Sequence, residues 1–342
     1  MTRTGSVLAI DAGNSKTDVA VVAEDGRVLG SARGPGFLPH LVGAEPAVAG
    51  LEPLVLEAVT TAGLTGPTGS VRHVSACLAN ADLPLEVQLL ETAVKARGWG
   101  TTSAVLNDTD ALLRAGLDEP HGVAVICGAG INCTARAPDG SEVRFAAVGQ
   151  ISGDWGGGGF LWAEAMWWAA RAADGRGPET ALREALPAHF GEGSMEALIA
   201  RVHLGHLSHA RCLEMTPLLF EVADSGDRVA LDVVRRQATE VADLAVAALT
   251  RLDVLEQPMP VVLGGGVLTA GHRLLHAWID ERLALRAPLA TTRVVVSAPV
   301  LGAGLLGLDA VGASPGAKDR LRAAYASEGP SQLSVGGSRT EA

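Results

Sequence analysis

The sequence predicts an α/β protein of two domains that share one plan. Short apolar runs that end in polar or glycine-containing loops alternate with helical segments, which is typical of sheets layered with helices. A unit of strand, loop, strand, Asp-Gly turn and strand begins at Val7, and a similar unit begins at Gly122. The chain has 342 residues, of which 48% are hydrophobic, so two modest domains can each bury a core.

The first half of the chain alternates between predicted strands and helices. The predicted strands are short runs rich in β-branched and apolar residues: 7–10, 19–22, 28–32, 71–78 and 104–106. The predicted helices cover residues 51–62, 83–97 and 111–115. Asp82 is expected to cap the second helix, with Pro84 in its first turn.

Two seven-residue loops relate the two halves of the chain. Asp11–Thr17 (DAGNSKT) and Gly128–Thr134 (GAGINCT) both follow an apolar run, share an Ala-Gly pair and end in Thr. Asp139-Gly140 then repeats the turn at Asp25-Gly26. Such matches can arise by chance in a chain rich in Gly and Ala, but a duplicated β-hairpin unit explains them better. The duplication predicts two domains related by internal pseudo-symmetry.

The second half is predicted to be richer in helix. Helical patterns cover 160–173, 179–190, 195–203, 228–252 and 268–285, and strand patterns cover 260–263 and 293–297. We expect an N-terminal domain over 1–118, completed by a small-residue helix at 300–312, and a C-terminal domain over 119–299. Residues 313–342 are rich in Ser, Gly, Lys, Arg and Glu, and are expected to form a disordered tail.

Composition excludes several classes of protein. The net charge of −11 makes broad attraction to nucleic acid or to an anionic membrane surface unfavourable. No apolar stretch reaches the roughly 18 to 20 residues of a membrane helix, and the start of the chain lacks signal-peptide organisation. A cytoplasmic protein with reduced thiols is expected, because the four cysteines form no CxxC pair: Cys77, Cys127, Cys133 and Cys212.

Three histidines are spaced by three residues, at His203, His206 and His209. They could share one face of a helix as zinc ligands, but no fourth ligand accompanies them. A solvated helix face is the better interpretation, and no metal site is predicted there.

Three glycine-containing loops follow predicted strands and are candidates for binding phosphate through backbone N–H groups. The candidate residues are Gly13, Asn14, Ser15, Lys16, Thr17, Gly128, Gly130, Gly264, Gly265 and Gly266. Each loop alone can be a plain turn, and none matches a P-loop or a dinucleotide fingerprint. Together they favour a mononucleotide held by two hairpin domains. Lys16 could pair with phosphate, although strand alternation points it away from Ser15 and Thr17.

Asp11 lies at the end of the first predicted strand, beside the first of these loops. A carboxylate oxygen is a ligand that Mg²⁺ prefers, either directly or through water. Asp11 is therefore expected to organise Mg²⁺ with the nucleotide.

Five motifs in this order resemble the actin-like sugar kinase superfamily, specifically the BadF/BadG/BcrA/BcrD ATPase family and its N-acetylglucosamine kinase branch. The motifs are LAIDAGNSKTDVAVV, VLNDTDALLRAG, VICGAGINC, GQISGDWGGGGFLW and VVLGGGV. The resemblance implies two ribonuclease-H-like (actin-like ATPase) domains with a cleft between them, and ATP and Mg²⁺ as cofactors. It also implies a homodimer that phosphorylates the 6-hydroxyl of a small amino sugar, with N-acetylglucosamine first among the candidates.

The resemblance assigns roles to individual polar residues. It implies that Asp108 is the catalytic base and contacts the sugar, and that Asn132 and Asp154 bind the sugar. Asp110 is the local rival for the base, although it could be an ordinary helix-start residue. Trp155 stands where the family usually has Glu.

Alternative functions remain open. The chain could phosphorylate another sugar: glucosamine, N-acetylmuramic acid or glucose. It could be an ATP-dependent activator of an acyl-CoA dehydratase, but Cys127 and Cys133 flank the second phosphate loop rather than the segment that holds the iron–sulfur cluster of such activators. A non-catalytic sugar sensor or a pantothenate kinase is less compatible with the motifs.

Overall fold

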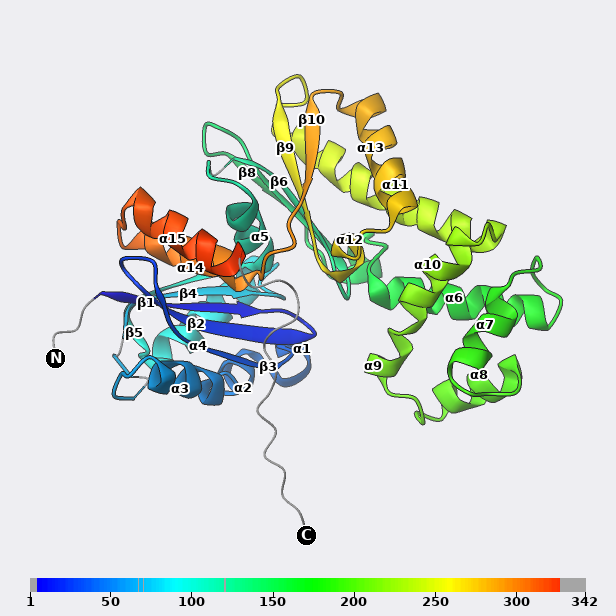
Figure 1. Cartoon of the computed structure of the whole chain (residues 1–342), viewed down its shortest axis with the longest axis horizontal. Coiled ribbons are helices and arrows are strands. Elements are labelled where there is room, and N and C mark those ends of the chain that lie inside the picture. The colour runs from blue at the N-terminus through cyan, green and yellow to red at the C-terminus, as the bar shows by residue number, and fades with distance from the viewer. Residues whose placement is uncertain (1–4, 67, 70, 120, 327–342) are drawn as a thin grey trace, which may run out of the picture. The chain divides into compact units, whose positions relative to one another are not determined.

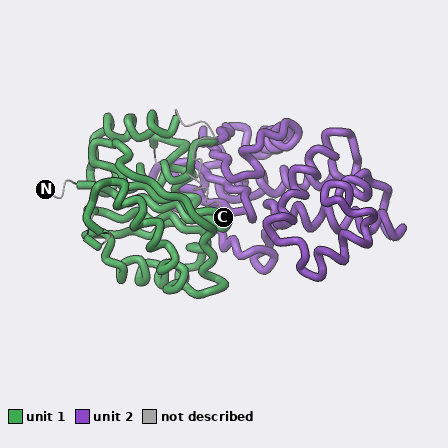
Figure 2. The backbone as a smooth tube through the Cα atoms, turned by 60° about the horizontal axis from the view of Figure 1, so that its bottom comes forward, with its two compact units in different colours: residues 1–119, 295–342 green, residues 120–294 purple. Residues whose placement is uncertain are grey.

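The chain divides into two compact units. The computed structural model describes residues 5–66, 68–69, 71–119 and 121–326. Unit 1 contains residues 1–119 and 295–342, and unit 2 contains residues 120–294 (Figure 2). The expected boundaries were 118 and 299. In both units a mixed β-sheet is layered with helices, so the predicted α/β class is confirmed.

Unit 1 is built on a five-stranded sheet of order β3-β2-β1-β4-β5. Its strands are β1 (Ser6–Ala12), β2 (Lys16–Ala23), β3 (Val28–Pro35), β4 (Val71–Leu78) and β5 (Gly100–Asn107). The first three strands are antiparallel neighbours, whereas β1, β4 and β5 run parallel to one another. The carboxyl ends of the three parallel strands therefore lie at one edge of the sheet.

Helices cover both faces of this sheet (Figure 1). One face carries α2 (Ala44–Ala49), α3 (Glu52–Thr61) and α4 (Pro84–Arg97), preceded by the short α1 (Pro39–Val42). The other carries α5 (Asp108–Gly116), α14 (Val300–Ala310) and α15 (Pro315–Ala326). Period-two alternation sends Leu8 and Ile10 to the first face and Val7 and Ala9 to the second. By the same alternation Asp11 lies on the face of α5 and α14.

Unit 2 repeats this plan, with the sheet order β10-β9-β6-β7-β8. Its strands are β6 (Gly122–Cys127), β7 (Ile131–Arg136), β8 (Glu142–Arg144), β9 (Met259–Gly264) and β10 (Ala290–Val294). The hairpin turns also match: Gly26 and Gly140 both have φ of 88°. Their N–H groups donate to the carbonyl three residues earlier, over 2.8 and 3.0 Å respectively. The predicted repeat of the strand, loop, strand, turn and strand unit is confirmed.

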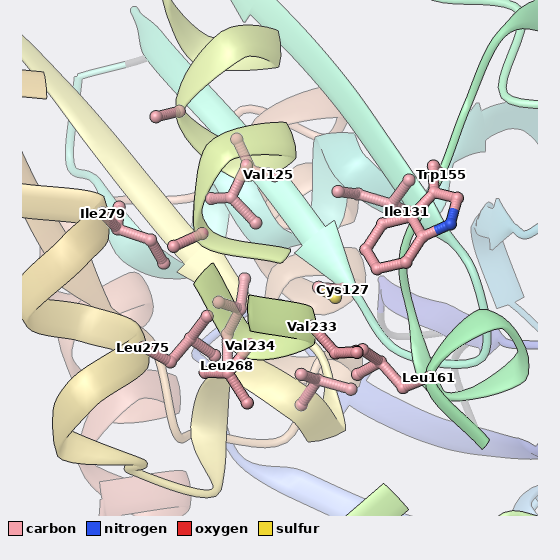
Figure 3. Packing of buried hydrophobic residues seen from close by; sticks show 14 of the residues in the cluster. Val125, Cys127, Ile131, Trp155, Leu161, Val233, Val234, Leu268, Leu275 and Ile279 are labelled. Carbon is pink, nitrogen blue, oxygen red and sulfur yellow. The ribbon is translucent and has the colours of Figure 1, made fainter. Parts of the chain in front are cut away.

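Helices and one large apolar cluster fill out unit 2. The helical elements are η1 (Gly149–Ser152), α6 (Gly158–Ala173), α7 (Leu182–His189), α8 (Met195–His203), α9 (His209–Cys212), α10 (Met215–Asp224), α11 (Arg228–Arg251), α12 (Gly266–Thr269) and α13 (Arg273–Arg286). Figure 3 shows Val125 and Cys127 of β6 in this cluster with Leu161 of α6 and Val233 of α11. The cluster fixes β6 and β9, whose ends carry two of the glycine loops.

The expectation of a disordered tail over 313–342 is wrong for residues 315–326, which form α15. Leu321 of this helix is fully buried against α14, because one face of the segment is apolar enough to join the core. The charged residues that suggested disorder lie on its other faces. Residues 327–342 lie outside the described part of the chain.

Asp82 does not cap α4. Leu83 occupies the N-cap position, and Glu86 accepts hydrogen bonds from the backbone N–H groups of Asp82 and Leu83. The backbone N–H groups before the first turn of α4 are thus capped by a carboxylate from the third residue of the helix. The Asp82 side chain is used elsewhere, as described below.

Other boundaries also differ from the prediction. The last strand of unit 2 covers 290–294 rather than 293–297, and the expected helix over 268–285 is split into α12 and α13. Helix α5 starts at residue 108 instead of 111, because Asn107 caps it.

Within the described ranges, no helix is long and apolar enough to cross a membrane. His203 ends α8 and His209 begins α9, so the three spaced histidines do not share one helix. The described residues contain no group of three or more His, Cys, Asp or Glu side chains that could hold a metal ion. All four cysteines are free and buried.

Candidate active site

The sheet of unit 1 brings Asp11 and Asp108 to one edge. Asp11 is the penultimate residue of β1, and Asp108 directly follows the last residue of β5. The strand ends are in register, because Ala12 pairs with Leu78 and Leu78 pairs with Asn107. Ligand sites of α/β proteins lie at such carboxyl ends of parallel strands. This edge is therefore the candidate catalytic part of unit 1.

Asp11 lies among other carboxylates. Its side chain is 5% exposed, and burial raises its pKa well above the usual value, with Asp108 and Asp18 adding repulsion and Lys16 opposing the rise. The charge of Asp18 is balanced by Arg33, whose Nε and Nη2 donate to its two oxygens over 2.5 and 3.1 Å. A divalent cation at Asp11 would relieve the remaining repulsion. Hard carboxylate oxygens fit Mg²⁺, with water and phosphate oxygens as further ligands.

A capping box fixes the start of α5. The Oδ1 of Asn107 accepts hydrogen bonds from the N–H of Thr109 over 3.0 Å and from its hydroxyl over 2.7 Å. In return, Oδ2 of Asp110 accepts the N–H of Asn107 over 3.0 Å. Asp110 thus has the helix-start role considered for it, whereas Asp108, the first residue of α5, is not used by the cap.

Asp108 is half-buried, and its surroundings favour the protonated form. Burial and, after it, repulsion from the neighbouring Asp82 raise its pKa to about 7, although a hydrogen bond from the N–H of Thr109 works in the opposite direction. A carboxylate that titrates at neutral pH can take a proton from an alcohol and release it again. The position of Asp108 therefore suits a general base.

The loop between β1 and β2 presents several of the predicted phosphate ligands to solvent. The N–H of Gly13 donates to the carbonyl of Lys16 over 2.9 Å, which closes the turn and leaves Asn14, Ser15 and Lys16 exposed. The Lys16 ammonium lies 3.9 Å from Asp18. Thr17 is fully buried, and its hydroxyl has no hydrogen-bond partner among the described residues. Ser15 and Lys16 are therefore accessible to a ligand in unit 1, whereas the hydroxyl of Thr17 is not.

In unit 2, glycines allow two loops to touch the end of β6. Gly265, which follows the last strand residue Gly264, has φ of +87°, and a Cβ there would lie 2.5 Å from the backbone of Cys127. Gly157 has φ of +85°, and its Cβ would lie 2.5 Å from the backbone of Gly130. A side chain at either position would push the loops apart.

Hydrogen bonds join the segment at residues 157–159 to the loop at residues 128–130. The N–H of Gly158 donates to the carbonyl of Gly128 over 2.7 Å, and that of Gly159 donates to Ala129 over 2.9 Å. Other glycines face open space, since a Cβ at Gly128, Gly130 or Gly266 would meet no atom within 4 Å. The result is a rigid glycine-lined surface, backed by the N-terminus of α6, that an anion could approach closely.

The two predicted sugar-binding residues of unit 2 lie on separate elements. Asn132 belongs to β7, and its Oδ1 accepts the N–H of Cys133 over 2.7 Å. The half-buried Asp154 accepts hydrogen bonds from the N–H of Gly149, over 3.2 Å, and from the hydroxyl of Ser152. These bonds fix the orientation of Asp154.

Trp155, which stands where the family usually has Glu, is 7% exposed. The guanidinium of Arg236 lies over its ring at 4.0 Å, and Figure 3 shows the ring beside Ile131 in the core. Trp155 therefore packs in the core and supplies no carboxylate at this position.

Sequence reasoning missed three contributors to these sites. Gly157 and Gly159 contact the loop at residues 128–130, and Asp82 raises the pKa of Asp108. The run of four glycines after Trp155 was a visible signal for the first two. The third had no signal, because Asp82 precedes Asp108 by 26 residues and meets it through the pairing of β4 with β5.

Solved structures share this fold. A candidate N-acetylglucosamine kinase from Chromobacterium violaceum matches with a TM-score of 0.70 at 23% identity, covering 90% of this chain and 100% of that one. A glucokinase of the ROK family from Streptomyces griseus, solved with glucose and AMPPNP, matches with a TM-score of 0.56 at 19% identity, covering 90% and 99%. At such identities the likeness shows the two-domain actin-like fold.

Curated relatives extend the comparison to sequence. The N-acetylmuramic acid/N-acetylglucosamine kinase of Clostridium acetobutylicum is 26% identical over 77% of this chain and 85% of its own length. The N-acetyl-D-glucosamine kinase of Dictyostelium discoideum is 24% identical over 88% of this chain and 97% of its own. The model of one family matches residues 8–307, which is most of the chain. The protein therefore belongs to the BadF/BadG/BcrA/BcrD ATPase family, as its five motifs predict.

Proposed function

We propose that this protein is an ATP- and Mg²⁺-dependent kinase that phosphorylates the 6-hydroxyl of an amino sugar, with N-acetylglucosamine as the first candidate. The observation that carries the proposal is Asp108, a half-buried carboxylate with a pKa of about 7 at the start of a capped helix. Such a group can accept the proton of a sugar hydroxyl at neutral pH. The curated relatives, named as kinases of N-acetylglucosamine and N-acetylmuramic acid, support the substrate class.

In this mechanism each unit supplies different groups. In unit 2, the glycine loops at residues 128–130 and 264–266 are assigned to ATP. In unit 1, Ser15 and Lys16 are assigned to phosphate. Mg²⁺ at Asp11, bound directly or through water, would neutralise phosphate charge. Asp108 takes the proton of the sugar 6-hydroxyl, and the oxygen of that hydroxyl forms a bond to the γ-phosphorus of ATP. The bond between the γ-phosphorus and the β,γ-bridging oxygen breaks, which releases ADP.

Asn132 and Asp154 are assigned to the sugar. The fixed carboxylate of Asp154 can accept hydrogen bonds from sugar hydroxyls, and the amide of Asn132 can donate to them. Because Trp155 offers no carboxylate in place of the family's Glu, we expect looser recognition on that side of the sugar. N-acetylmuramic acid, glucosamine and glucose are therefore included as candidate substrates.

A coupled assay of ADP release tests the function. Purified protein with MgATP is offered N-acetylglucosamine, N-acetylmuramic acid, glucosamine, N-acetylmannosamine and glucose, and the products are identified by mass spectrometry and NMR. We expect sugar-dependent ADP release with phosphate at C6. ADP release without any sugar dependence across the panel would refute the kinase assignment.

The activator alternative is weakened by the cysteines. Burial raises the pKa of Cys127 to about 12, and Cys133 is 1% exposed. Cluster ligands must be thiolates, and these two thiols are held in their neutral form within the core.

We also propose that the protein is a homodimer and acts in the cytoplasm. Light scattering coupled to gel filtration measures the mass of the assembly.

A further inference from the structure

Helix α15 holds the C-terminal end of α5. The Nη1 of Arg322 donates to the carbonyl of Ala115 over 2.7 Å, and its Nη2 donates to those of Arg114 and Leu117 over 3.1 and 2.9 Å. The last carbonyls of a helix have no partner within the helix, and a cation there also opposes the negative end of the helix dipole. The family match ends at residue 307, before α15 begins.

A second layer of charge supports this contact. Arg114, which is 9% exposed, donates from Nε to Oδ2 of Asp309 over 2.7 Å. Lys318 of α15 lies 2.5 Å from the other oxygen of the same carboxylate. The carboxylate of Asp309, on α14, thus joins α5 to α15.

The middle of α5 is held by backbone contact. A Cβ on Gly302 of α14 would lie 1.8 Å from the carbonyl oxygen of Ala111, so the two helices touch without an intervening side chain. Helix α5 is therefore fixed at its start by the capping box, at its middle by Gly302 and at its end by Arg322. As a rigid nine-residue helix, it transmits a change at one end to the other.

The remaining contacts of α15 fix the helix itself. Leu321 is fully buried in the core beneath α14. Arg320, on another side of α15, donates to the carbonyl of Asp25 in the β2–β3 turn, away from α5. Loss of Arg322 would thus leave α15 docked while removing three hydrogen bonds from the end of α5.

We propose that Arg322 is a positioning residue that sets the placement of Asp108 through α5, an inference that rests on the proposed kinase function. Ala115 lies roughly 10 Å along the helix axis from Asp108, too far for a screened surface charge to act strongly on that carboxylate. Arg322 therefore acts by holding the helix rather than through its charge.

Steady-state kinetics of three variants test the proposal. Arg322→Ala should lower kcat by about ten- to a hundredfold, because a displacement near 1 Å costs that much in catalysis, with little change in the KM for ATP. Arg322→Lys should recover part of the loss, since one ammonium can bond some of the carbonyls. Arg320→Ala removes a matched charge from α15 and should keep wild-type kcat. Equal losses in the two alanine variants would overturn the proposal.

A double-mutant cycle separates positioning from general destabilisation. If Arg322 acts through Asp108, Arg322→Ala should have little effect on the residual kcat of an Asp108→Asn background. An undiminished loss in that background would mean that Arg322 serves the fold generally.

Hydrogen exchange gives a readout that needs no kinase activity. Arg322→Ala should speed exchange of the amides of α5 relative to wild type and to Arg320→Ala, while exchange in β1 and β4 stays unchanged. If Arg322→Ala shows this faster exchange but the wild-type protein phosphorylates no sugar, the proposed kinase function is refuted, whereas the role of Arg322 in holding α5 is supported. Unchanged exchange in α5 would overturn the proposal whatever the activity.

Discussion

The Nδ2 of Asn107 donates to Oδ1 of Asp82 over 2.8 Å. The same nitrogen also donates to the carbonyl of Ala81 over 3.2 Å, so the residue that caps α5 also holds a second carboxylate near its start. Asp82 is, after burial, the largest cause that raises the pKa of Asp108. This pairing couples the cap of the helix to the proton affinity of the proposed base.

The first prediction concerns pH. Asp108 works as a base only when ionised, so activity should be lost as the pH falls through its pKa of about 7. Below that pH, kcat/KM for the sugar should fall about tenfold per pH unit. Asp82→Asn removes a repelling charge and lowers the pKa of Asp108. The fall in kcat/KM at acid pH, the acid limb of the profile, should therefore occur at lower pH.

Glu91→Gln provides the control for the pH profile. It removes one negative charge from an exposed site on α4, and the acid limb should keep its position. If Asp82→Asn and Glu91→Gln gave the same profile as wild type, Asp82 would have no part in tuning the base.

The second prediction separates the two candidate bases. Asp108→Asn keeps the size of the side chain but cannot take a proton, so kcat should fall by about 10² to 10⁴ while ATP affinity changes little. Asp110→Asn still offers an oxygen to the N–H of Asn107, so it should cost mainly stability. Steady-state kinetics and thermal melts of both variants check this. A large loss of kcat confined to Asp110→Asn would reassign the base.

The third prediction concerns stability and Mg²⁺. A carboxyl whose folded pKa lies above its unfolded value of 3.8 destabilises the fold as the pH rises through the folded pKa. Asp11→Asn removes this penalty, so its melting temperature without Mg²⁺ should exceed that of wild type at pH 8. The difference should shrink toward pH 4. Differential scanning fluorimetry across this pH range measures it.

Mg²⁺ with ATP should raise the melting temperature of wild type more than that of Asp11→Asn. Asp139→Asn is the control, because hydrogen bonds from Ser141 lower the pKa of this exposed turn residue, and its replacement should not stabilise the protein at pH 8. Equal Mg²⁺-dependent stabilisation of wild type and Asp11→Asn would remove Asp11 from the metal site.

The fourth prediction contrasts two adjacent glycines. Gly265→Ala places a Cβ against the backbone of Cys127 at a φ that disfavours other residues, and should lower stability by about 1 to 3 kcal/mol or more. At Gly266 a Cβ meets open space, so Gly266→Ala should melt like wild type yet raise the KM for ATP several-fold. Chemical denaturation and kinetics on both variants test this. An unchanged KM for ATP in Gly266→Ala would place the nucleotide elsewhere.

The sequence alone determined the repeated plan of the two units and the glycine loops within it. Both are local properties: a hairpin follows from strand periodicity and an Asp-Gly turn, and Gly26 and Gly140 adopt the same φ in the two units. The motifs also sufficed to identify the family, which the match over residues 8–307 confirms.

Only the tertiary structure decided how the proposed base is supported. Asp82 meets Asp108 through strand pairing, and Arg322 reaches Ala115 across more than two hundred residues of chain. Neither contact leaves a periodic signal, because each is made by one side chain. The charged residues of 315–326 suggested disorder, yet a single apolar stripe that includes Ala317 and Leu321 is enough to dock the helix. The helix docks because α14 presents an apolar surface that fits it. The sequence of 315–326 gives no indication of that surface.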